Sequence, residues 1–192
     1  MMDPIYLDLL RRALNNRGIE TAQGLSEDEL AVIEGDFGFR FPPDLRELLA
    51  NFLPVGDDLP DWRSRNQHLL EWLDFPAEGV AFDVEENDFW CDAWGERPDD
   101  MDDAVEEARR QVALAPILIP VYGHAFLPSR PGSAGNPVLS VAQTDVSLAG
   151  SDLGWYFYEE LSAPRPDWSP KEPRKIDFWS DLLVPKHPPE AE

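Results

Sequence analysis

The side chains of this chain that are able to do chemistry are few and lie far apart in the sequence. Its three histidines, His68, His124 and His187, form no H-x-x-H or H-E-x-x-H pattern, so a zinc site needs ligands from distant segments. Cys91, His124 and Asp145 have the residue types of a nucleophile triad, but no sequence feature brings them together. A lone cysteine is often a small core residue. We therefore predict a protein that is not an enzyme and holds no metal and no cofactor.

Two acidic runs share part of the spacing of a calcium-binding loop. The run 99–103 has Met101 at a position that requires an oxygen ligand, and no EF-hand glycine follows it. The run that begins at Asp83 has Asp88 where the loop requires glycine. Residues 132–135 lack the lysine of a phosphate-binding loop and the serine spacing of a nucleophile elbow. These patterns indicate solvated acidic stretches and a flexible turn.

Aromatic and acidic side chains alternate in the segment 62–114. The rings are those of Trp62, Trp72, Phe75, Phe82, Phe89, Trp90 and Trp94. Aromatic side chains supply much of the binding energy of protein interfaces, and surrounding carboxylates suit a basic partner. We predict that the partner-binding residues are Trp62, Asp88, Trp90, Asp92, Trp94, His124 and Asp145.

The alternative for these aromatic residues is burial, because large rings are mostly buried. We expect Trp72, Phe75 and Phe82 in the core, whereas core and surface stay equally open for Trp62, Trp90 and Trp94. His124 follows a predicted strand, which is a common place for a functional residue, although a structural histidine is the alternative there.

The net charge narrows the class of partner. Asp and Glu number 38 and Lys and Arg number 16, so the formal net charge is −22. Affinity for nucleic acid depends on cationic side chains, so we exclude nucleic acid and, on the same ground, an anionic membrane surface. Complementary fields accelerate encounter, and a basic protein is therefore the predicted partner. The alternative is that the acidity only keeps the protein soluble.

The chain of 192 residues is expected to form one domain in the cytoplasm. Its single cysteine is unable to form an intrachain disulfide, and its first residues lack the basic start of a signal peptide. The longest apolar run, 112–122, contains two prolines and falls short of the ~18 residues that a membrane span needs.

Capping signals predict three helices at the beginning of the chain. They run from Asp3-Pro4 to Gly18, from Ser26 to Phe37 and from Pro43 to Pro54. The second is the most clearly marked, because Ser26 and Glu29 form a capping box, flanked by the hydrophobic staple of Leu25 and Leu30. Gly38 has the position of the left-handed residue that ends this helix.

The rest of the chain adds strands. We expect a short helix over 64–73, a strand containing Val80, Phe82 and Val84, a helix over 101–114, strands over 117–122, 125–127 and 137–142, and a helix capped by Ser151 or Asp152 that ends at Leu161. A proline-rich, partly mobile arm over 162–173, a helical turn within 176–184 and eight disordered final residues complete the prediction. Early helices without regular β-α-β alternation favour an α+β fold.

The residues of 25–52 resemble a family signature. The capped helix, the run Gly-Phe-Arg-Phe-Pro-Pro-Asp-Leu-Arg-Glu-Leu-Leu at 38–49, the strand 118–121, Thr144-Asp145 and a closing helix that ends near Leu161 together resemble the SUKH superfamily. This superfamily contains Smi/Knr-type cell-wall regulators and many bacterial toxin-immunity proteins. The match is best over 25–52 and looser over 117–161.

The resemblance implies a single α+β domain over residues 1–161, with a mixed, mostly antiparallel sheet and helices packed against it. Residues 62–114 would be an aromatic and acidic insertion, and residues 162–192 a proline-rich arm and tail. The implied activity is binding: an immunity-type protein that neutralises a basic toxin, such as a nuclease domain, by occlusion. The alternative is a small-molecule or peptide-binding regulatory module with a pocket near Trp90, Trp94 and His124.

Overall fold

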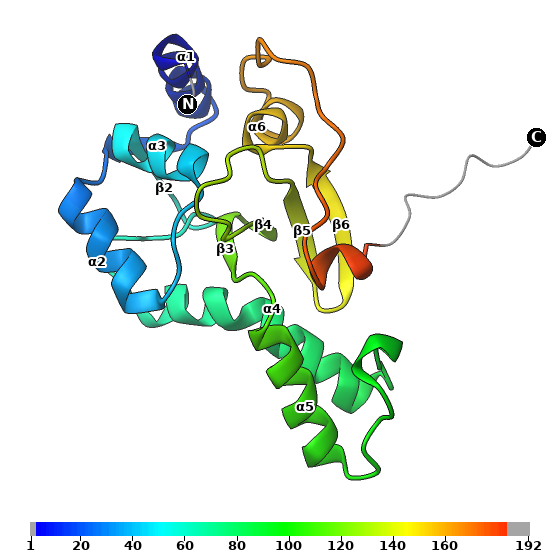
Figure 1. Ribbon diagram of the computed structural model, residues 1–192. Coiled ribbons are helices and arrows are strands. Elements are labelled where there is room, and N and C mark those ends of the chain that lie inside the picture. Colours follow the sequence, from blue (N-terminus) through cyan, green and yellow to red (C-terminus); the bar gives the residue numbers. More distant parts are fainter. Residues whose placement is uncertain (1–2, 184–192) are drawn as a thin grey trace, which may run out of the picture.

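The computed structural model describes residues 3–183 and confirms an α+β fold (Figure 1). Its helices are α1 (Pro4–Asn16), α2 (Glu27–Phe37), α3 (Pro43–Asn51), α4 (Gln67–Glu86), α5 (Met101–Ala113) and α6 (Leu153–Leu161), with short 3-10 turns η1 (Asp92–Trp94) and η2 (Trp179–Asp181). Its strands are β1 (Glu20–Gln23), β2 (Phe52–Val55), β3 (Leu118–Tyr122), β4 (Ala125–Pro128), β5 (Val138–Ala142) and β6 (Asp145–Gly150). The expected disorder of the last eight residues lies outside the described residues.

The capping signals before α2 act as predicted. The Glu29 backbone N–H donates to Ser26 Oγ at 3.2 Å, and the Ser26 backbone N–H donates to Glu29 Oε2 at 2.7 Å. Leu25 and Leu30 are both buried in the same core cluster, and Gly38 ends the helix with a φ of +69°. Asp3 caps α1, Asp100 caps α5 and Asp152, rather than Ser151, caps α6.

The loop between α2 and α3 is organised by a buried glutamate. Glu34 accepts hydrogen bonds from Arg40 Nη1 at 2.7 Å and from the Phe41 backbone N–H at 3.1 Å, and Arg46 Nε lies 3.5 Å from it. Its side chain is only 3% exposed, so these partners compensate a charge that burial would otherwise penalise. The loop that carries the Gly-Phe-Arg-Phe-Pro run is thereby folded against α2.

Both faces of the larger sheet are buried. β3, β4, β5 and β6 are joined in sequence order by antiparallel pairing. Along β3 and β4, Ile119 and Leu127 contribute to the cluster under α1, α2, α3 and α6, whereas Leu118 and Phe126 contribute to the cluster with α4 and α5. This alternation follows from the two-residue period of a strand. The prediction that the third helix runs to Pro54 is wrong at its end: α3 stops at Asn51, and Phe52–Val55 form β2, which pairs with β1 in a separate antiparallel sheet.

The prediction for residues 64–95 is wrong in one respect. One helix, α4, replaces the expected short helix and the strand with Val80, Phe82 and Val84. Val80 and Val84 are fully buried one helical turn apart, while Phe82 is 48% exposed on the other side. Two valines four residues apart suit a helix face as well as a strand, and Pro76 is accommodated inside the helix.

The arm after α6 is packed against the domain. Residues 162–175 have no regular structure, but Trp168 Nε1 donates to Asp152 Oδ2 at 2.8 Å. Further along, Ile176 and Trp179 are buried in the cluster that α4 and α5 form with the sheet, and Trp179 Nε1 donates to the Pro116 carbonyl at 2.8 Å. The predicted helical turn within 176–184 is present as η2.

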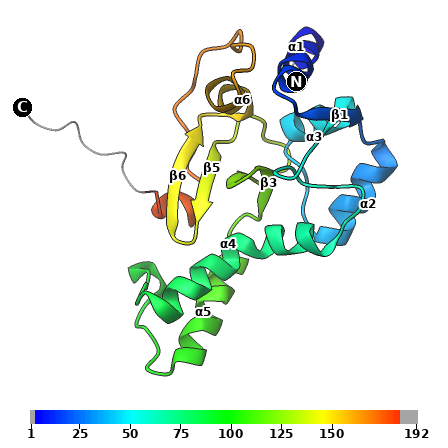
Figure 2. The same cartoon turned by 180° about the vertical axis from the view of Figure 1, so that it is seen from behind.

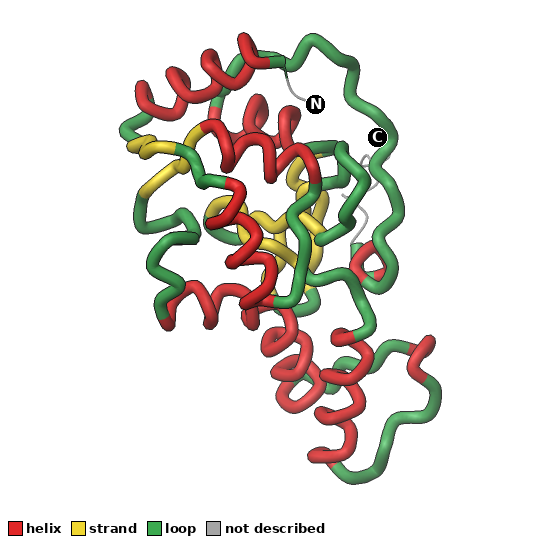
Figure 3. Tube along the Cα trace, turned by 60° about the vertical axis from the view of Figure 1, so that its left-hand side comes forward, coloured by secondary structure: helices red, strands yellow, loops and turns green. Residues whose placement is uncertain are grey.

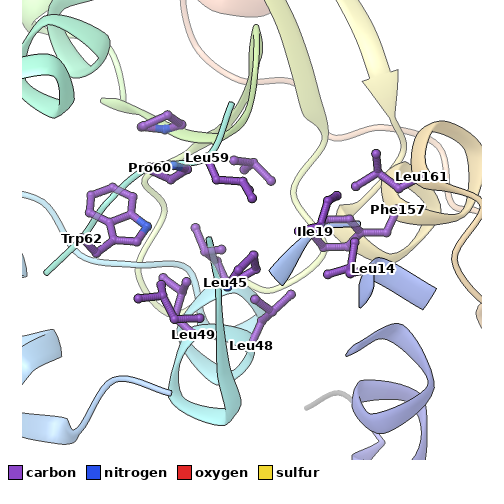
Figure 4. Close-up of a pocket in the computed structure, with 14 residues that line it drawn as sticks. Leu14, Ile19, Leu45, Leu48, Leu49, Leu59, Pro60, Trp62, Phe157 and Leu161 are labelled. Atoms are coloured by element: carbon purple, nitrogen blue, oxygen red, sulfur yellow. The ribbon is translucent and has the colours of Figure 1, made fainter. Parts of the chain in front are cut away.

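A small apolar pocket lies in the main core (Figure 4). Leucines of α1 and α3, together with Trp62, Phe157 and Leu161, surround it, and its volume is about 20 Å³. A cavity of this size holds roughly one water, and an apolar one stays dry, so it is not a ligand site. Among residues 3–183, no helix combines the length and apolar character that crossing a membrane requires.

The substitution Ser26→Ala is expected to lower the free energy of unfolding by about 1 kcal/mol, because it removes the acceptor for the Glu29 amide. Ser169→Ala, at an exposed position of the arm, is the matched control and is expected to change it little. Urea unfolding of both variants measures the difference. Equal stability of the two variants would show that the capping box contributes nothing.

Candidate functional site

The α4–α5 hairpin carries more than half of the charge of the chain. We call residues 67–113 the acidic hairpin; they contain 15 Asp and Glu and three Arg, a formal net charge of −12. The first half of α4 packs against the sheet, whereas its second half, α5 and the loop between them extend away from the sheet on the side opposite to α6 (Figures 1 and 2). The exposed carboxylates of its outer half are those of Glu85, Glu86, Asp88, Asp92, Glu96, Asp99, Asp100, Asp102, Asp103 and Glu106. The outer parts of the two helices and the loop that joins them, whose course Figure 3 traces, therefore carry a concentrated set of exposed carboxylates.

Apolar side chains are exposed among these carboxylates. Phe82 lies on the solvent side of α4, where Glu78 precedes it by four residues and Glu86 follows it by four. Residues four apart share one face of a helix, so the ring is flanked by carboxylates. Met101 is exposed at the first turn of α5. An exposed ring surrounded by charge is the kind of feature that marks a protein-binding surface.

The arginines of the acidic hairpin hold its own structure together. Arg97 pairs with Asp88, and its Nη2 donates to the Val84 carbonyl at 2.8 Å, so it ties the loop to the end of α4. Arg109 of α5 pairs with Glu78 of α4 at 2.8 Å. The hydrogen bond and the charge of Glu78 raise the pKa of the Arg109 guanidinium above its ordinary value. These cations are engaged within the hairpin and do not form a basic patch.

A buried carboxylate joins α4 to the turn between β5 and β6. Asp83 Oδ2 accepts from the Thr144 backbone N–H at 2.9 Å and from Thr144 Oγ1 at 2.6 Å, and Asp83 Oδ1 accepts from Asn87 Nδ2 at 2.6 Å. Burial opposes ionisation of Asp83, but these hydrogen bonds outweigh it and lower the pKa of the carboxyl below its ordinary value. The ionised side chain is therefore part of the junction.

A glycine allows the same turn to approach α4 closely. A β-carbon placed on Gly79 would lie 2.8 Å from Gln143 Cα and 3.2 Å from Gln143 N. Both distances are shorter than the ordinary van der Waals contact between a β-carbon and a backbone atom. Gln143 itself has a φ of +59°. Gly79 and Asp83, one helical turn apart, thus form the junction between the acidic hairpin and the sheet.

The tryptophans of the hairpin are half-buried. The rings of Trp90 and Trp94 meet at right angles with centroids 5.1 Å apart, and Trp94 stacks on Phe178 with centroids 5.9 Å apart. Trp90 Nε1 donates to the Gly95 carbonyl at 2.8 Å. Both rings therefore fix the loop after α4 against the arm, and only their remaining exposed edges are open to a partner.

The structure places the predicted partner-binding residues in different regions. Asp88 and Asp92 are exposed near the two tryptophans. Trp62 is a correction: it is 1% exposed and packs edge-on against Phe41, with centroids 5.2 Å apart, so its side chain is core and is not able to touch a partner. The expectation that Phe75 and Phe82 are core is also wrong, since both are exposed, whereas Trp72 is half-buried.

His124 and Asp145 are exposed but do not join Trp90 and Trp94. The His124 ring lies 5.8 Å from that of Phe75, beside the first half of α4, and Asp145 begins β6. From Phe75 to the end of α4 the helix rises about 16 Å, and both tryptophans follow that end. Within the described part of the chain, no ring contact joins His124 to Trp90 or Trp94, and no hydrogen bond, ion pair or ring contact brings Cys91, His124 and Asp145 together. Among residues 3–183, no three His, Cys, Asp or Glu side chains converge as metal ligands.

Comparison of the chain with protein-family models, with curated proteins and with solved structures finds no match. The resemblance to the SUKH superfamily stays a prediction from the residues of 25–52 and 117–161.

The substitution Gly79→Ala is expected to lower the free energy of unfolding by about 1 kcal/mol or more, because the added methyl group meets the Gln143 backbone. Gly35→Ala is the matched control, since Gly35 lies in α2 with open space around it. It is expected to raise stability by roughly 0.5–1 kcal/mol through helix propensity alone. If both substitutions stabilise the protein, the junction is looser than described.

Asp83 is expected to make stability depend on pH. The pKa of Asp83 is lower in the folded protein than its ordinary value of 3.8. The contribution of Asp83 to the free energy of unfolding is therefore fully present above the pKa of the unfolded state and is lost as pH falls through the pKa of the folded state. At pH 7, Asp83→Asn is expected to cost about 1–3 kcal/mol, a difference that shrinks below pH 4. Urea unfolding between pH 7 and pH 3 measures it. Asp145→Asn, on the same turn but exposed, is the control and is expected to follow the wild type. A pH-independent cost for Asp83→Asn would contradict the assignment.

Proposed function

We propose that this chain is a non-enzymatic, cytoplasmic protein-binding module that docks on a basic protein through its acidic hairpin. One observation supports the proposal most: the acidic hairpin carries −12 of the net −22 charge, its outer half projects from the domain, and its arginines pair with carboxylates of the hairpin itself. Charge needed only for solubility has no reason to gather on one projecting element.

The geometry suits electrostatic recognition. At physiological ionic strength, charges are screened over about 8 Å, so an attractive field reaches a partner best from an element that stands away from the body of the protein. Such a field raises the rate of encounter more than it slows dissociation. The exposed ring of Phe82 supplies the complementary contribution, because burying an aromatic side chain contributes about 1.5–3 kcal/mol.

The partner that fits best is a toxin whose active site binds phosphate. A nuclease domain needs cationic side chains to hold its substrate, and an acidic hairpin with apolar contacts would compete for the same surface. Occlusion of that surface would neutralise the enzyme without any chemistry on the part of this chain. The resemblance of residues 25–52 to a superfamily that contains immunity proteins supports this role.

The first test is charge reversal on the acidic hairpin. Glu86→Lys, Glu96→Lys, Asp99→Lys and Glu106→Lys together change four exposed positions that cap no helix. With a basic protein captured from the source cells and purified, the association rate at low salt is expected to fall about tenfold or more, because the steering field is lost. Stopped-flow kinetics at low and high salt measures the rate.

The control carries the same change of charge elsewhere: Glu20→Lys, Asp57→Lys, Glu159→Lys and Asp167→Lys, all exposed and outside the hairpin. It is expected to slow association much less. Equal slowing by the two variants would mean that net charge, and not the hairpin, governs encounter. If the captured partner is a nuclease, a stoichiometric amount of this chain is expected to inhibit it, and full activity of the complex would contradict occlusion.

The second test concerns Phe82. Phe82→Ala is expected to raise the dissociation rate by about tenfold, corresponding to the loss of one buried ring, with little effect on association. Ile5→Ala, at an exposed apolar position of α1, serves as the control. Unchanged dissociation in Phe82→Ala would place the contact elsewhere on the hairpin.

A further inference from the structure

A polar cavity lies at the opposite end of the molecule from the acidic hairpin. It is bounded by the first turn of α3, the loop between β4 and β5, the beginning of α6 and the arm that follows α6 (Figure 1). Its volume is about 210 Å³, many times the roughly 10–15 Å³ that one water needs. It has no part in the proposed docking surface.

Two buried carboxylates line this cavity. Asp44 accepts from the backbone N–H groups of Leu45 at 3.0 Å and Gly135 at 2.8 Å, and only 6% of the residue is exposed. Asp152, 7% exposed, accepts from the backbone N–H of Trp155 at 2.9 Å and from the indole of Trp168. Neither forms an ion pair within residues 3–183.

The hydrogen bonds fix the positions of these two carboxylates but do not neutralise their negative charges. A buried anion is stabilised by a cation, and neutral donors replace only part of that interaction. Burial, with the negative charge of Asp152 as a further cause, raises the pKa of the Asp44 carboxyl above its ordinary value despite two backbone hydrogen bonds. The site thus lacks positive charge beside the carboxylates.

Positive charge is present on the wall that the arm contributes. Arg174 donates from Nη1 to the Ala134 carbonyl at 2.8 Å and to Asn136 Oδ1 at 3.3 Å. Arg174 and Lys171 both line the cavity, and both are exposed to solvent. No carboxylate of the described residues lies within ion-pair distance of either side chain. One cavity is therefore lined by two buried carboxylates and two exposed cations, and none of the four has an ion-pair partner among residues 3–183.

The remaining wall is the indole of Trp168. A β-carbon on Gly154 would lie 2.5 Å from the Trp168 ring, so glycine at this position is what lets the ring sit against the beginning of α6. The ring of Tyr6 meets it edge-on at 5.5 Å. The indole is fixed on both sides, and a fixed aromatic wall attracts a cation or an apolar side chain.

We propose that this cavity binds a small zwitterion of the free α-amino acid class. The ammonium group lies between Asp44 and Asp152, and the carboxylate is held by Arg174 and Lys171. A ligand with both charges satisfies both unpaired sets at once, whereas a simple amine or a simple acid satisfies one set and leaves the other unpaired.

The test is calorimetric titration of the full chain with the protein amino acids at millimolar concentration. At least one is expected to bind, and its decarboxylated amine and its N-acetyl derivative are expected to bind at least tenfold more weakly. Asp44→Asn and Asp152→Asn keep the shape of the side chains and a hydrogen-bond acceptor, and each is expected to lower the affinity for the amino acid at least tenfold. Asp57→Asn, an exposed carboxylate elsewhere, is the control and is expected to bind as the wild type does.

Arg174→Gln changes the arm and not the core, so it keeps the test valid if a carboxylate variant fails to fold. Arg174→Gln is expected to lower the affinity for the amino acid and to leave the weak binding of the decarboxylated amine unchanged. The proposal is overturned if no amino acid binds, if the amine binds as tightly as the amino acid, or if Arg174→Gln binds as the wild type does.

Discussion

The junction of Asp83 and Gly79 with the β5–β6 turn is the constraint on which the arrangement of the molecule depends. The first half of α4 packs against the core and its second half belongs to the projecting part of the acidic hairpin, and this junction lies between the two halves. A hairpin with a net charge of −12 repels itself and any other acidic part of the chain. The ionised carboxylate of Asp83 accepts three hydrogen bonds, and the backbone of the β5–β6 turn packs directly against α4. Together these contacts fix the orientation of the hairpin, which a flexible contact would not do.

This constraint links the fold to the proposed function. An element that steers a partner is useful only if its charges keep a fixed geometry when the partner arrives, since ordering it at that moment would lower affinity. The half-buried rings of Trp90 and Trp94 contribute to the same rigidity, because they connect the loop after α4 to Phe178 of the arm. Trp90 and Trp94 keep part of their surface open to a partner, and the exposed ring of Phe82 is a further candidate anchor beside them.

The helices with explicit caps could be predicted from the sequence. Asp3, Ser26, Asp100 and Asp152 each act locally, so the beginnings of α1, α2, α5 and α6 follow from neighbouring residues. α4 could not be predicted in full, because the alternation of Val80, Phe82 and Val84 suits a strand until the partners of the two valines are known. The same limit applies to the site: aromatic composition places binding potential in 62–114 but does not distinguish buried Trp62 from exposed Phe82. The polar cavity is formed by segments that lie up to more than a hundred residues apart in the sequence, so no local sequence pattern predicts it.

The central claim is that the acidic hairpin is a rigid docking element for a basic protein. Hydrogen–deuterium exchange of the chain, alone and with its purified basic partner, tests this claim most directly. We expect the amides of α4 near Gly79 and Asp83 to be well protected in the free protein, and additional protection on binding to be concentrated in residues 67–113. Rapid exchange throughout α4 in the free protein, or binding-induced protection confined to α1, α2 and α3, would contradict it.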